Sequence, residues 1–524
     1  MHFKLKKIAL IVSVLFISVI LSITITGCAS NQNNTGEEDA QSLVIGSPWT
    51  PKVLDTVKAG YLPLRIGMVD TLVSVNYDAE ISPGLAESWK VSGNGLEWTF
   101  KLKEGVKFHD GTPCDAEAVK WSLERVLQKG TLLKDVPLKA IEVKDENTLV
   151  ITTKEPFAPL PAYLAKGEAA PISKNSLNEK GELEKLIGTG PFKFDSWIPN
   201  QEVTLVKNKE YWGEVPQLDK VVYKGIPETA TRMMMLKSGE LDMARLLPAD
   251  AVEQLKSNTE IKVLTSPILR TRTVIFNLLK EPFNDLKVRK AVNYAIDRKA
   301  IVEHIMAGVD MPAKGAFPPT SPWANKDIEG YPYNLEKARQ LLAEAGWKDT
   351  DNDGILDKNG KPLKIDLITY TERASLPPTA EVMQEQLKKV GIQINLRISE
   401  WGGCEAASEK GDFDMFLLAR NLGFLPDPSY YLMSDYHSSN TGKGSGAYGY
   451  NNKRVDELVE QAQVTMDLQK RHNLYNEVQE IIVDETPVIF LNHYVNVIAV
   501  QSNVHGYKVH PTESCFHLEN VYFK

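Results

Sequence analysis

Four aspartates alternate with other residues in one short stretch of the chain. Asp349, Asp351 and Asp353 occupy every second position, and Asp357 follows after a glycine. Hard divalent cations are bound by several oxygen atoms from one tight turn, as in calcium loops. The bidentate glutamate of such a loop is absent here, because position 360 is glycine. The stretch therefore predicts either a structural calcium site or an acidic surface hairpin.

Arg420 and Asn421 follow directly after an apolar run, Met415 to Leu418, which is typical of a buried strand. An arginine positioned by a buried strand can bind a carboxylate through two hydrogen bonds, and asparagine adds a directional one. Both residues are therefore predicted to bind ligand. The alternative for Arg420 is a salt bridge to a nearby aspartate, namely Asp412, Asp414 or Asp427.

These residues belong to the stretch Gly411 to Asn452, and the part of it that follows the apolar run is polar and aromatic and rich in turn residues. A rigid strand followed by such a loop is typical of the rim of a binding cleft, although most loops of this kind are ordinary surface loops. Tyr430 is a further candidate for ligand contact. His437 is a candidate for contact with a metal chelate, because imidazole is a common metal ligand.

Two more arginines and one tryptophan are candidates outside that stretch. Arg270 and Arg272 lie two residues apart, so an extended strand would place both on one face. Trp401 follows a predicted strand, Ile394 to Ile398, and its ring could stack on a ligand, or it could lie in the core. Arg65 is a weaker candidate.

The sequence carries no pattern typical of catalysis. It has no nucleophile elbow, phosphate-binding loop or zinc-protease motif, and its nine histidines show no metal-ligand spacing. Its four cysteines are far apart and form no paired motif: Cys28, Cys114, Cys404 and Cys515. We therefore predict that the protein is not an enzyme and requires no cofactor.

Length and charge limit the architecture and the partners. A chain of 524 residues is too long for one compact core, so two or more lobes are expected. The net charge is -8, and removal of a leader with three lysines and no acidic residue would make it -11. An acidic chain without a basic run is a poor match for nucleic acid.

The first residues have the pattern of an export signal. Lys4, Lys6 and Lys7 precede an apolar run, Ile8 to Thr26, and small residues then lead to Cys28. This order resembles the bacterial lipobox, which implies cleavage before Cys28 and lipid on its thiol. The alternative is an uncleaved membrane anchor, since the run is close to the ~20 residues that span a bilayer.

Several motifs along the chain belong together as one pattern. They are Pro83 to Trp89 (PGLAESW), Gly105 to Pro113 (GVKFHDGTP), Gly188 to Phe192 (GTGPF), Val288 to Arg298 (VRKAVNYAIDR) and Tyr448 to Leu458 (YGYNNKRVDEL). Together these motifs resemble the family-5 extracytoplasmic solute-binding proteins of ABC importers, the peptide and nickel class. The resemblance extends from about Leu43 to the last residues.

This resemblance implies an α/β fold of the two-lobed periplasmic-binding-protein type II (class C), with an extra inserted subdomain. Mapped onto this chain, residues 1–27 form the lipoprotein signal peptide and 28–42 a disordered linker. The predicted domains are lobe one (43–75, 188–272 and 490–524), the inserted subdomain (76–187) and lobe two (273–489). The run Val488 to Val500 reads as strand, which suits a return to the first sheet.

The resemblance also implies the function: an extracytoplasmic lipoprotein, anchored to the cell membrane, that passes its ligand to an ABC permease and ATPase. The ligand is either a chelate of nickel or another transition metal, or a di- or oligopeptide; a non-transport peptide sensor on the same fold is a further alternative. Asp427 falls near the family position that binds a peptide's α-amino group, but its flanking residues depart from that motif. We favour the chelate and expect a monomer.

Overall fold

The computed structural model describes residues 41–440 and 446–524 of the chain. Residues Gln41 to Lys524 form one compact unit. The predicted signal peptide, Cys28 and all but the end of the predicted linker lie outside the described residues. Within the described residues, no helix is both long enough and apolar enough to cross a membrane.

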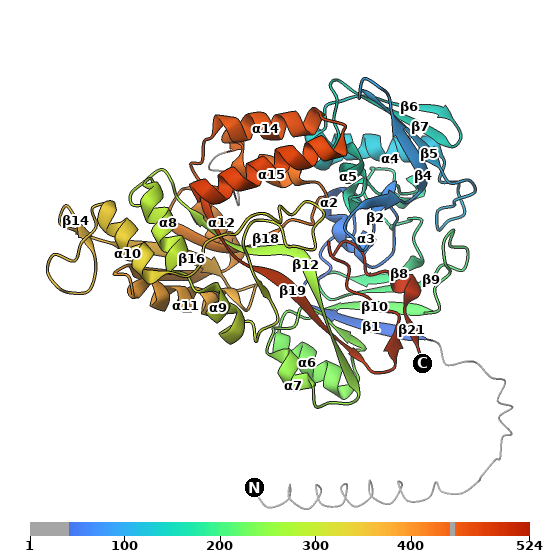
Figure 1. Ribbon diagram of the computed structural model, residues 1–524. Helices are drawn as coiled ribbons and strands as arrows, with labels where there is room; N and C mark the ends of the chain where they lie inside the picture. Colours follow the sequence, from blue (N-terminus) through green and yellow to red (C-terminus); the bar gives the residue numbers. More distant parts are fainter. Residues whose placement is uncertain (1–40, 441–445) are drawn as a thin grey trace, which may run out of the picture. The chain divides into compact units, whose positions relative to one another are not determined.

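A mixed sheet of 11 strands organises the fold, which confirms the α/β prediction (Figure 1). In spatial order the strands are β17 (Gln393–Ser399), β16 (Lys364–Tyr370), β18 (Met415–Asn421), β12 (Ile261–Phe276), β19 (Val488–Gln501), β11 (Met243–Ala244), β1 (Ser42–Ser47), β10 (Lys220–Gly225), β9 (Glu202–Lys207) and β8 (Phe192–Ile198), and β13 (Met311–Pro312) pairs with β19. The predicted strand at Val488 is confirmed.

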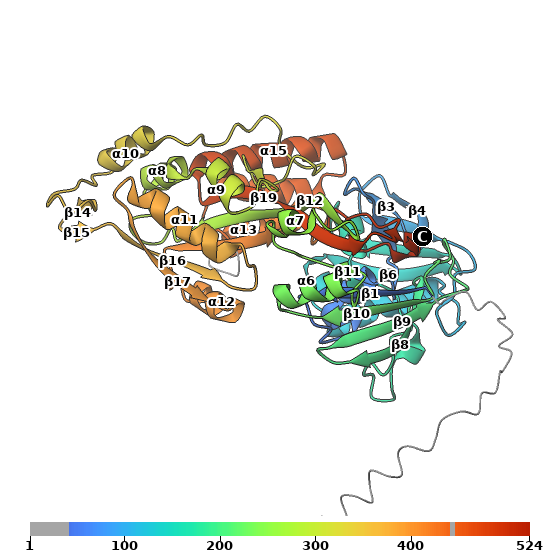
Figure 2. The ribbon, with the colours of Figure 1, turned by 90° about the horizontal axis from the view of Figure 1, so that it is seen from below.

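The two long central strands, β12 and β19, are antiparallel and join the two ends of the sheet (Figures 1 and 2). Strand β19 is buried along nearly its whole length, so apolar residues occupy both of its faces instead of alternating with polar ones, and Asn492, His493 and Asn496 are buried among them. The predicted lobe limits at 272 and 490 fall inside these strands. The lobe boundaries therefore stay a prediction, since both strands belong to both ends of one sheet.

Helices cover the end of the sheet formed by β16, β17 and β18. They are α8 (Leu286–Ala295), α9 (Arg298–His304), α10 (Leu335–Glu344), α11 (Leu376–Lys388) and α12 (Trp401–Glu409). Two further helices, α14 (Lys453–Val464) and α15 (Leu468–Glu485), lie side by side (Figure 1). The apolar faces of all these helices and of the sheet form one hydrophobic core. Met383 of α11, Leu417 of β18 and Leu458 of α14 are fully buried in that core.

A separate four-stranded antiparallel sheet forms within residues 86–153, in the order β4 (Ala86–Val91), β5 (Glu97–Leu102), β7 (Thr148–Thr153) and β6 (Leu138–Asp145). The helix α4 (Ala116–Lys129) packs against it and has its own core with α5 (Leu160–Leu164). Asp115 caps α4 by accepting a hydrogen bond from the backbone nitrogen of Ala118, at 2.9 Å.

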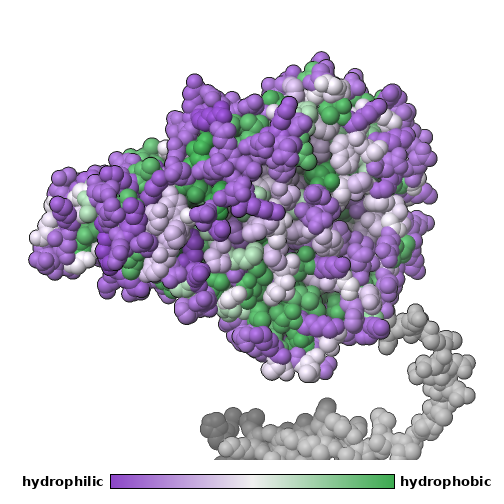
Figure 3. Space-filling model, in the orientation of Figure 1, coloured by the Kyte–Doolittle hydropathy of each residue, from purple (hydrophilic) through white to green (hydrophobic). Residues whose placement is uncertain are grey.

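The remaining elements are short or peripheral. They are α2 (Thr56–Ala59), α3 (Tyr61–Arg65), α6 (Thr229–Ser238), α7 (Ala251–Leu255), α13 (Pro428–Tyr436) and the hairpins β2–β3 (Val73–Val75, Ile81–Pro83), β14–β15 (Asp357–Lys358, Lys361–Pro362) and β20–β21 (Val504–His505, Tyr522–Phe523). Hydrophilic residues cover most of the face in Figure 3, and apolar ones gather near α6, where Met234 is 63% exposed.

Candidate ligand-binding site

A cavity of about 230 Å³ lies where segments far apart in the sequence meet. Its walls come from the segment around α2 and α3, the turn after α5, strand β12, the loop after β16, the loop after β18 and the C-terminal segment. The lining residues are Trp49, Tyr61, Leu64, Arg65, Val75, Ala165, Lys166, Gly167, Glu168, Arg270, Arg373, Asn421, Gly423, Phe424, Pro426, Thr512, Glu513 and Ser514.

Basic side chains outnumber acidic ones in this cavity. The four basic residues are Arg65, Lys166, Arg270 and Arg373, and the two acidic ones are Glu168 and Glu513. Trp49, Tyr61 and Phe424 add aromatic rings. Several cationic groups beside aromatic faces favour a small anionic ligand, because guanidinium groups bind carboxylates and aromatic rings exclude water.

Glu513 is the acceptor around which the arginines gather. Arg270 donates to its carboxylate at 3.0 Å, and Nε of Arg65 donates to its backbone carbonyl at 2.7 Å. Burial opposes ionisation of Glu513, but Arg270, Arg373, Arg65 and Arg245 together lower its pKa to about 2. One carboxylate therefore compensates several guanidinium groups, and the arginines keep an excess of positive charge.

Arg373 has neither a hydrogen-bond nor an ion-pair partner among the described residues. It lies in the loop just before helix α11, and its guanidinium carbon is 5.8 Å from the ring centre of Trp49 and 5.8 Å from that of Tyr494. Burial and the like charge of Arg270 lower its pKa. A guanidinium group without an acceptor in a desolvated cavity is stabilised by an anion, so Arg373 is positioned to bind one.

Lys166 is a second buried cation of the cavity. Its ammonium lies 3.7 Å from Glu168 and over the ring of Phe424. Burial lowers its pKa to about 7, and the coulombic effect of Glu168 counteracts only part of that change. The charge of the cavity therefore depends on pH near neutrality.

Of the eight predicted ligand-binding residues, Arg270 and Asn421 line this cavity. Arg420, beside Asn421 on β18, instead has its guanidinium against Asp435, with nitrogen–oxygen distances of 2.7 and 2.6 Å. Burial opposes its charge, but the carboxylate of Asp435 raises its pKa. Arg420 therefore forms a salt bridge, as the alternative prediction had it, but with Asp435 and not with Asp412, Asp414 or Asp427. A contact between Arg420 and a ligand stays a prediction.

Three other candidates are occupied by protein contacts. Arg272 pairs with Asp310 and lies 3.6 Å from the centre of the Tyr494 ring. Asp427 caps α13 and pairs with Arg471 at 2.6 Å, and both side chains are buried. The Trp401 ring packs 5.0 Å from Tyr370, as expected for a core side chain.

The two remaining candidates, Tyr430 and His437, do not line the cavity. The ring of Tyr430 is 6.2 Å from that of Phe424, which does line it. His437 ends α13, where its Nδ1 lies 2.8 Å from Ser439 and its Nε2 lies 3.1 Å from Glu460. Their roles in ligand binding stay predictions.

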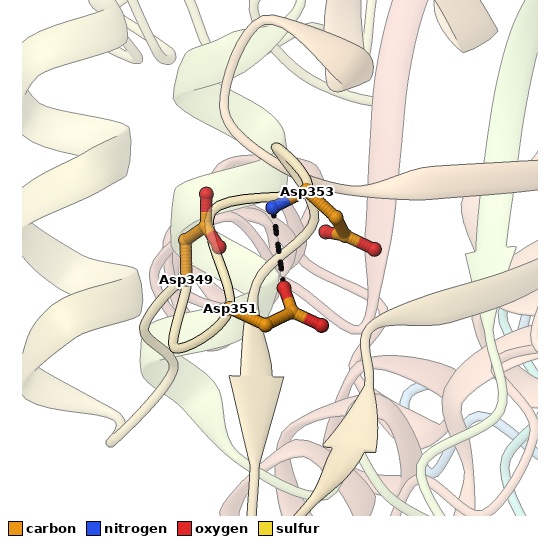
Figure 4. Close-up of side chains that lie close together, drawn as sticks. All are labelled: Asp349, Asp351 and Asp353. Atoms are coloured by element: carbon orange, nitrogen blue, oxygen red, sulfur yellow. Dashed lines mark hydrogen bonds between the residues drawn. The ribbon is translucent and has the colours of Figure 1, made fainter.

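The acidic loop brings three of its four predicted metal ligands together (Figure 4). Carboxylate oxygens of Asp349, Asp351 and Asp353 lie within 4.8 Å of one another, and all three residues are exposed. Asp357 instead accepts a hydrogen bond from the hydroxyl of Thr350, at 3.2 Å. Three oxygen donors fit a hard cation, so a structural calcium ion stays a prediction.

A second cavity, of about 180 Å³, adjoins the first and shares four of its lining residues, Leu64, Val75, Ala165 and Ser514. Asp70, Cys515, His517 and Glu519 also line it. Cys515 has the largest effect on His517 and, together with Glu519, raises the pKa of His517 to about 11, against the opposing effect of burial. This cavity favours positive charge, in contrast to the first.

Sequence reasoning missed Arg373, Lys166 and Glu513. Arg373 follows a buried strand, β16, just as Arg420 follows the buried part of β18, so the same signal was present. Lys166 and Glu513 lie in irregular segments and have no local signal, because their role depends on contacts with residues more than 100 positions away.

Comparison with known proteins identifies the family. The sequence model of the bacterial extracellular solute-binding proteins, family 5 (middle), matches residues 80–443. The oligopeptide-binding protein AppA of Bacillus subtilis is 30% identical, with 98% of this chain and 99% of AppA covered. The chain belongs to family 5 of the bacterial extracellular solute-binding proteins. The resemblance seen in the sequence motifs is thereby confirmed.

Solved structures of family-5 proteins share the fold. The AppA structure in complex with a nonapeptide has a TM-score of 0.77 at 30% identity, covering 93% of this chain and 99% of that one. NikA from Staphylococcus aureus with Ni(L-His)2 has a TM-score of 0.77, and NikA from Brucella suis with Fe(III)-EDTA has 0.83; both are 26% identical and cover 92% of this chain and 100% of their own.

These neighbours are two-lobed type II periplasmic binding proteins, which confirms the predicted fold class. This family-5 protein is an extracytoplasmic substrate-binding protein of an ABC importer, and its relatives are binding proteins of transporters rather than enzymes. Its neighbours include binders of peptide and of nickel chelates, so the family leaves the choice of ligand to the residues of the cavity.

Proposed function

We propose that this family-5 protein is the lipid-anchored component of its importer and captures a small, carboxylate-rich chelate of nickel or another transition metal. The observation that carries the proposal is the arginine-lined cavity, in which Arg373 has no acceptor among the described residues and Arg270 shares one with its neighbours. The chelator's carboxylates would supply those acceptors, and the metal is cargo rather than a resident cofactor.

The cavity walls support capture by lobe closure. Trp49, Lys166 and Arg373 belong to segments that the predicted domain limits assign to lobe one, the inserted subdomain and lobe two. A ligand bonded to all three segments stabilises the closed state by the difference in its affinity for closed and open forms. The permease and ATPase would recognise that closed state. The lipid anchor at Cys28 is part of the proposal and lies outside the described residues.

The volume of the cavity supports a small ligand. At about 230 Å³ it is below the roughly 300–1,000 Å³ typical of drug-sized ligand pockets. A small anionic chelate is of a suitable size, whereas a long peptide is not. The structures of NikA with Ni(L-His)2 and with Fe(III)-EDTA are precedents for such cargo in similar proteins.

A second candidate ligand is a di- or oligopeptide, with transport or sensing as its use. The observation that favours it is the 30% identity to AppA, named as an oligopeptide-binding protein, over nearly the whole chain. A peptide's terminal carboxylate would also suit Arg270 and Arg373. Against this candidate, Asp427, near the family position for a peptide's α-amino group, already pairs with Arg471.

Calorimetry on the mature protein tests the choice of ligand. We expect binding of nickel mixed with L-histidine, and at least ~10-fold weaker binding by Arg373→Ala, because a charge-assisted pair worth about 1.4 kcal/mol or more is lost. Arg339→Ala, an exposed arginine of α10, is the matched control and should bind as the wild type does. Tight binding of dipeptides without any response to nickel and histidine would refute the chelate.

A further inference from the structure

The second cavity differs from the first in the chemistry of its walls. Asp70 and Glu519 are its acidic side chains, and among the described residues no lysine or arginine lines it. The two cavities adjoin along the four wall residues that they share. A group that enters the second cavity must tolerate or prefer an acidic surrounding.

Cys515 and His517 bring a thiol and an imidazole to this cavity from one tight segment. Cys515 is free, and its sulfur accepts a hydrogen bond from the backbone nitrogen of His517 at 3.4 Å. Nδ1 of His517 lies 2.9 Å from a carboxylate oxygen of Glu519. A carboxylate that holds Nδ1–H fixes the orientation of the ring and leaves Nε2 to act as the donor atom, as in carboxylate–histidine–metal arrangements.

We propose that Cys515 and His517 bind a borderline divalent metal ion, such as Ni²⁺, in the second cavity. Glu519 is the positioning residue for His517, and the chelator of the same metal is bound by the arginines of the first cavity. This inference rests on the proposed function, because it gives the metal of the captured chelate two ligands from the protein. The remaining coordination positions belong to the chelator.

The donor set selects the class of metal. Thiolate and imidazole favour Ni²⁺, Co²⁺ and Zn²⁺ over Ca²⁺ and Mg²⁺, which prefer oxygen. Binding forms metal–sulfur and metal–nitrogen bonds, and the protons that the thiol and Nε2 carried pass to solvent. Asp70 contributes charge rather than a bond, because its oxygens already accept hydrogen bonds from Trp212, Thr189 and Tyr211.

Absorption spectroscopy on the mature protein tests this site directly. Titration with Co²⁺ or Ni²⁺, each with L-histidine as the chelator, should produce a thiolate-to-metal charge-transfer band in the wild type. Cys515→Ser should abolish the band, and His517→Asn should weaken metal binding by ~10-fold or more. Asparagine is chosen because His517 has a φ of 48°, a left-handed conformation that asparagine tolerates.

Matched controls separate this site from other thiols and imidazoles. Cys404→Ser alters a buried thiol that donates a hydrogen bond to the backbone oxygen of Thr369, and His505→Asn alters a histidine whose ring stacks on Tyr522. Neither residue lines the second cavity, so both variants should keep the thiolate-to-metal band. The wild-type spectrum requires no variant to fold.

The outcomes distinguish this inference from the proposed function. Calorimetric binding of nickel and histidine without a thiolate band, and with unchanged affinity in Cys515→Ser, would overturn the metal ligands and leave the chelate-binding function intact. A thiolate band with nickel alone, together with unaltered chelate binding in Arg373→Ala, would support the metal site and overturn the arginine cavity. Absence of both signals would overturn both.

Discussion

The charge balance of the arginine cavity can be tested by one isosteric substitution, Glu513→Gln. The glutamine keeps the size of the side chain and an acceptor for Arg270, but removes the negative charge that the surrounding arginines share. The four arginines lower the pKa of Glu513 from 4.5 to about 2, and Glu513 is only 7% exposed. At about 1.4 kcal/mol for each pKa unit, the charge contributes roughly 3 kcal/mol of stability at neutral pH.

Equilibrium urea unfolding at pH 7 is the assay, and we expect a loss of roughly 3 kcal/mol in the free energy of unfolding of Glu513→Gln. The sign of the pH dependence follows from the depressed pKa. The stabilisation is fully present above pH 4.5 and is lost as the pH falls through about 2, so wild type and variant should converge in that window.

The surface pair Arg454–Glu477 supplies the matched control. Its side chains are 52% and 44% exposed, so Glu477→Gln should change stability by no more than about 1 kcal/mol. Equal stability of Glu513→Gln and the wild type at pH 7 would refute the reasoning. So would a difference between the two that persists unchanged down to pH 2.

Three further predictions follow from buried and exposed charges. Asp427→Ala leaves the buried guanidinium of Arg471 without its partner and should lower the free energy of unfolding by ~3–5 kcal/mol in urea titrations; a loss below about 1 kcal/mol would mean that water replaces the carboxylate. Because the pKa of Lys166 is about 7, the affinity for Fe(III)-EDTA, measured by calorimetry, should fall as the pH rises from 6 to 8, and Lys166→Met should remove that dependence. If the acidic loop binds calcium, millimolar Ca²⁺ should raise the melting temperature of the wild type and not of Asp351→Asn; equal shifts would exclude the loop.

Local sequence signals were sufficient for the elements that form the scaffold. The apolar runs at Met415 and Val488 became buried strands, and Asp115 caps its helix, because burial and capping depend on residues a few positions apart. The family motifs were sufficient to predict the fold class and the role in transport, since they extend over most of the chain.

The composition of the cavity was harder to predict than its existence. Arg420 and Arg373 both follow apolar runs of parallel neighbouring strands, yet Asp435 neutralises Arg420, and Arg373 has no acceptor among the described residues. The difference depends on whether a carboxylate elsewhere in the chain folds back onto the guanidinium. No local pattern in the sequence records that contact.

The sequence by itself determined the family, the α/β class and the strand that presents Arg420 and Asn421, because hydrophobic periodicity and linked motifs act over short separations. Only the tertiary structure decided which charges are compensated. Arg65, Arg270 and Glu513 are brought together across more than 400 residues, and desolvation in the shared cavity then determines their charge states. The aspartates of the acidic loop are close in sequence, so a local pattern predicted that they lie together. The ligand-binding site depends on contacts between distant segments, which no local pattern could predict.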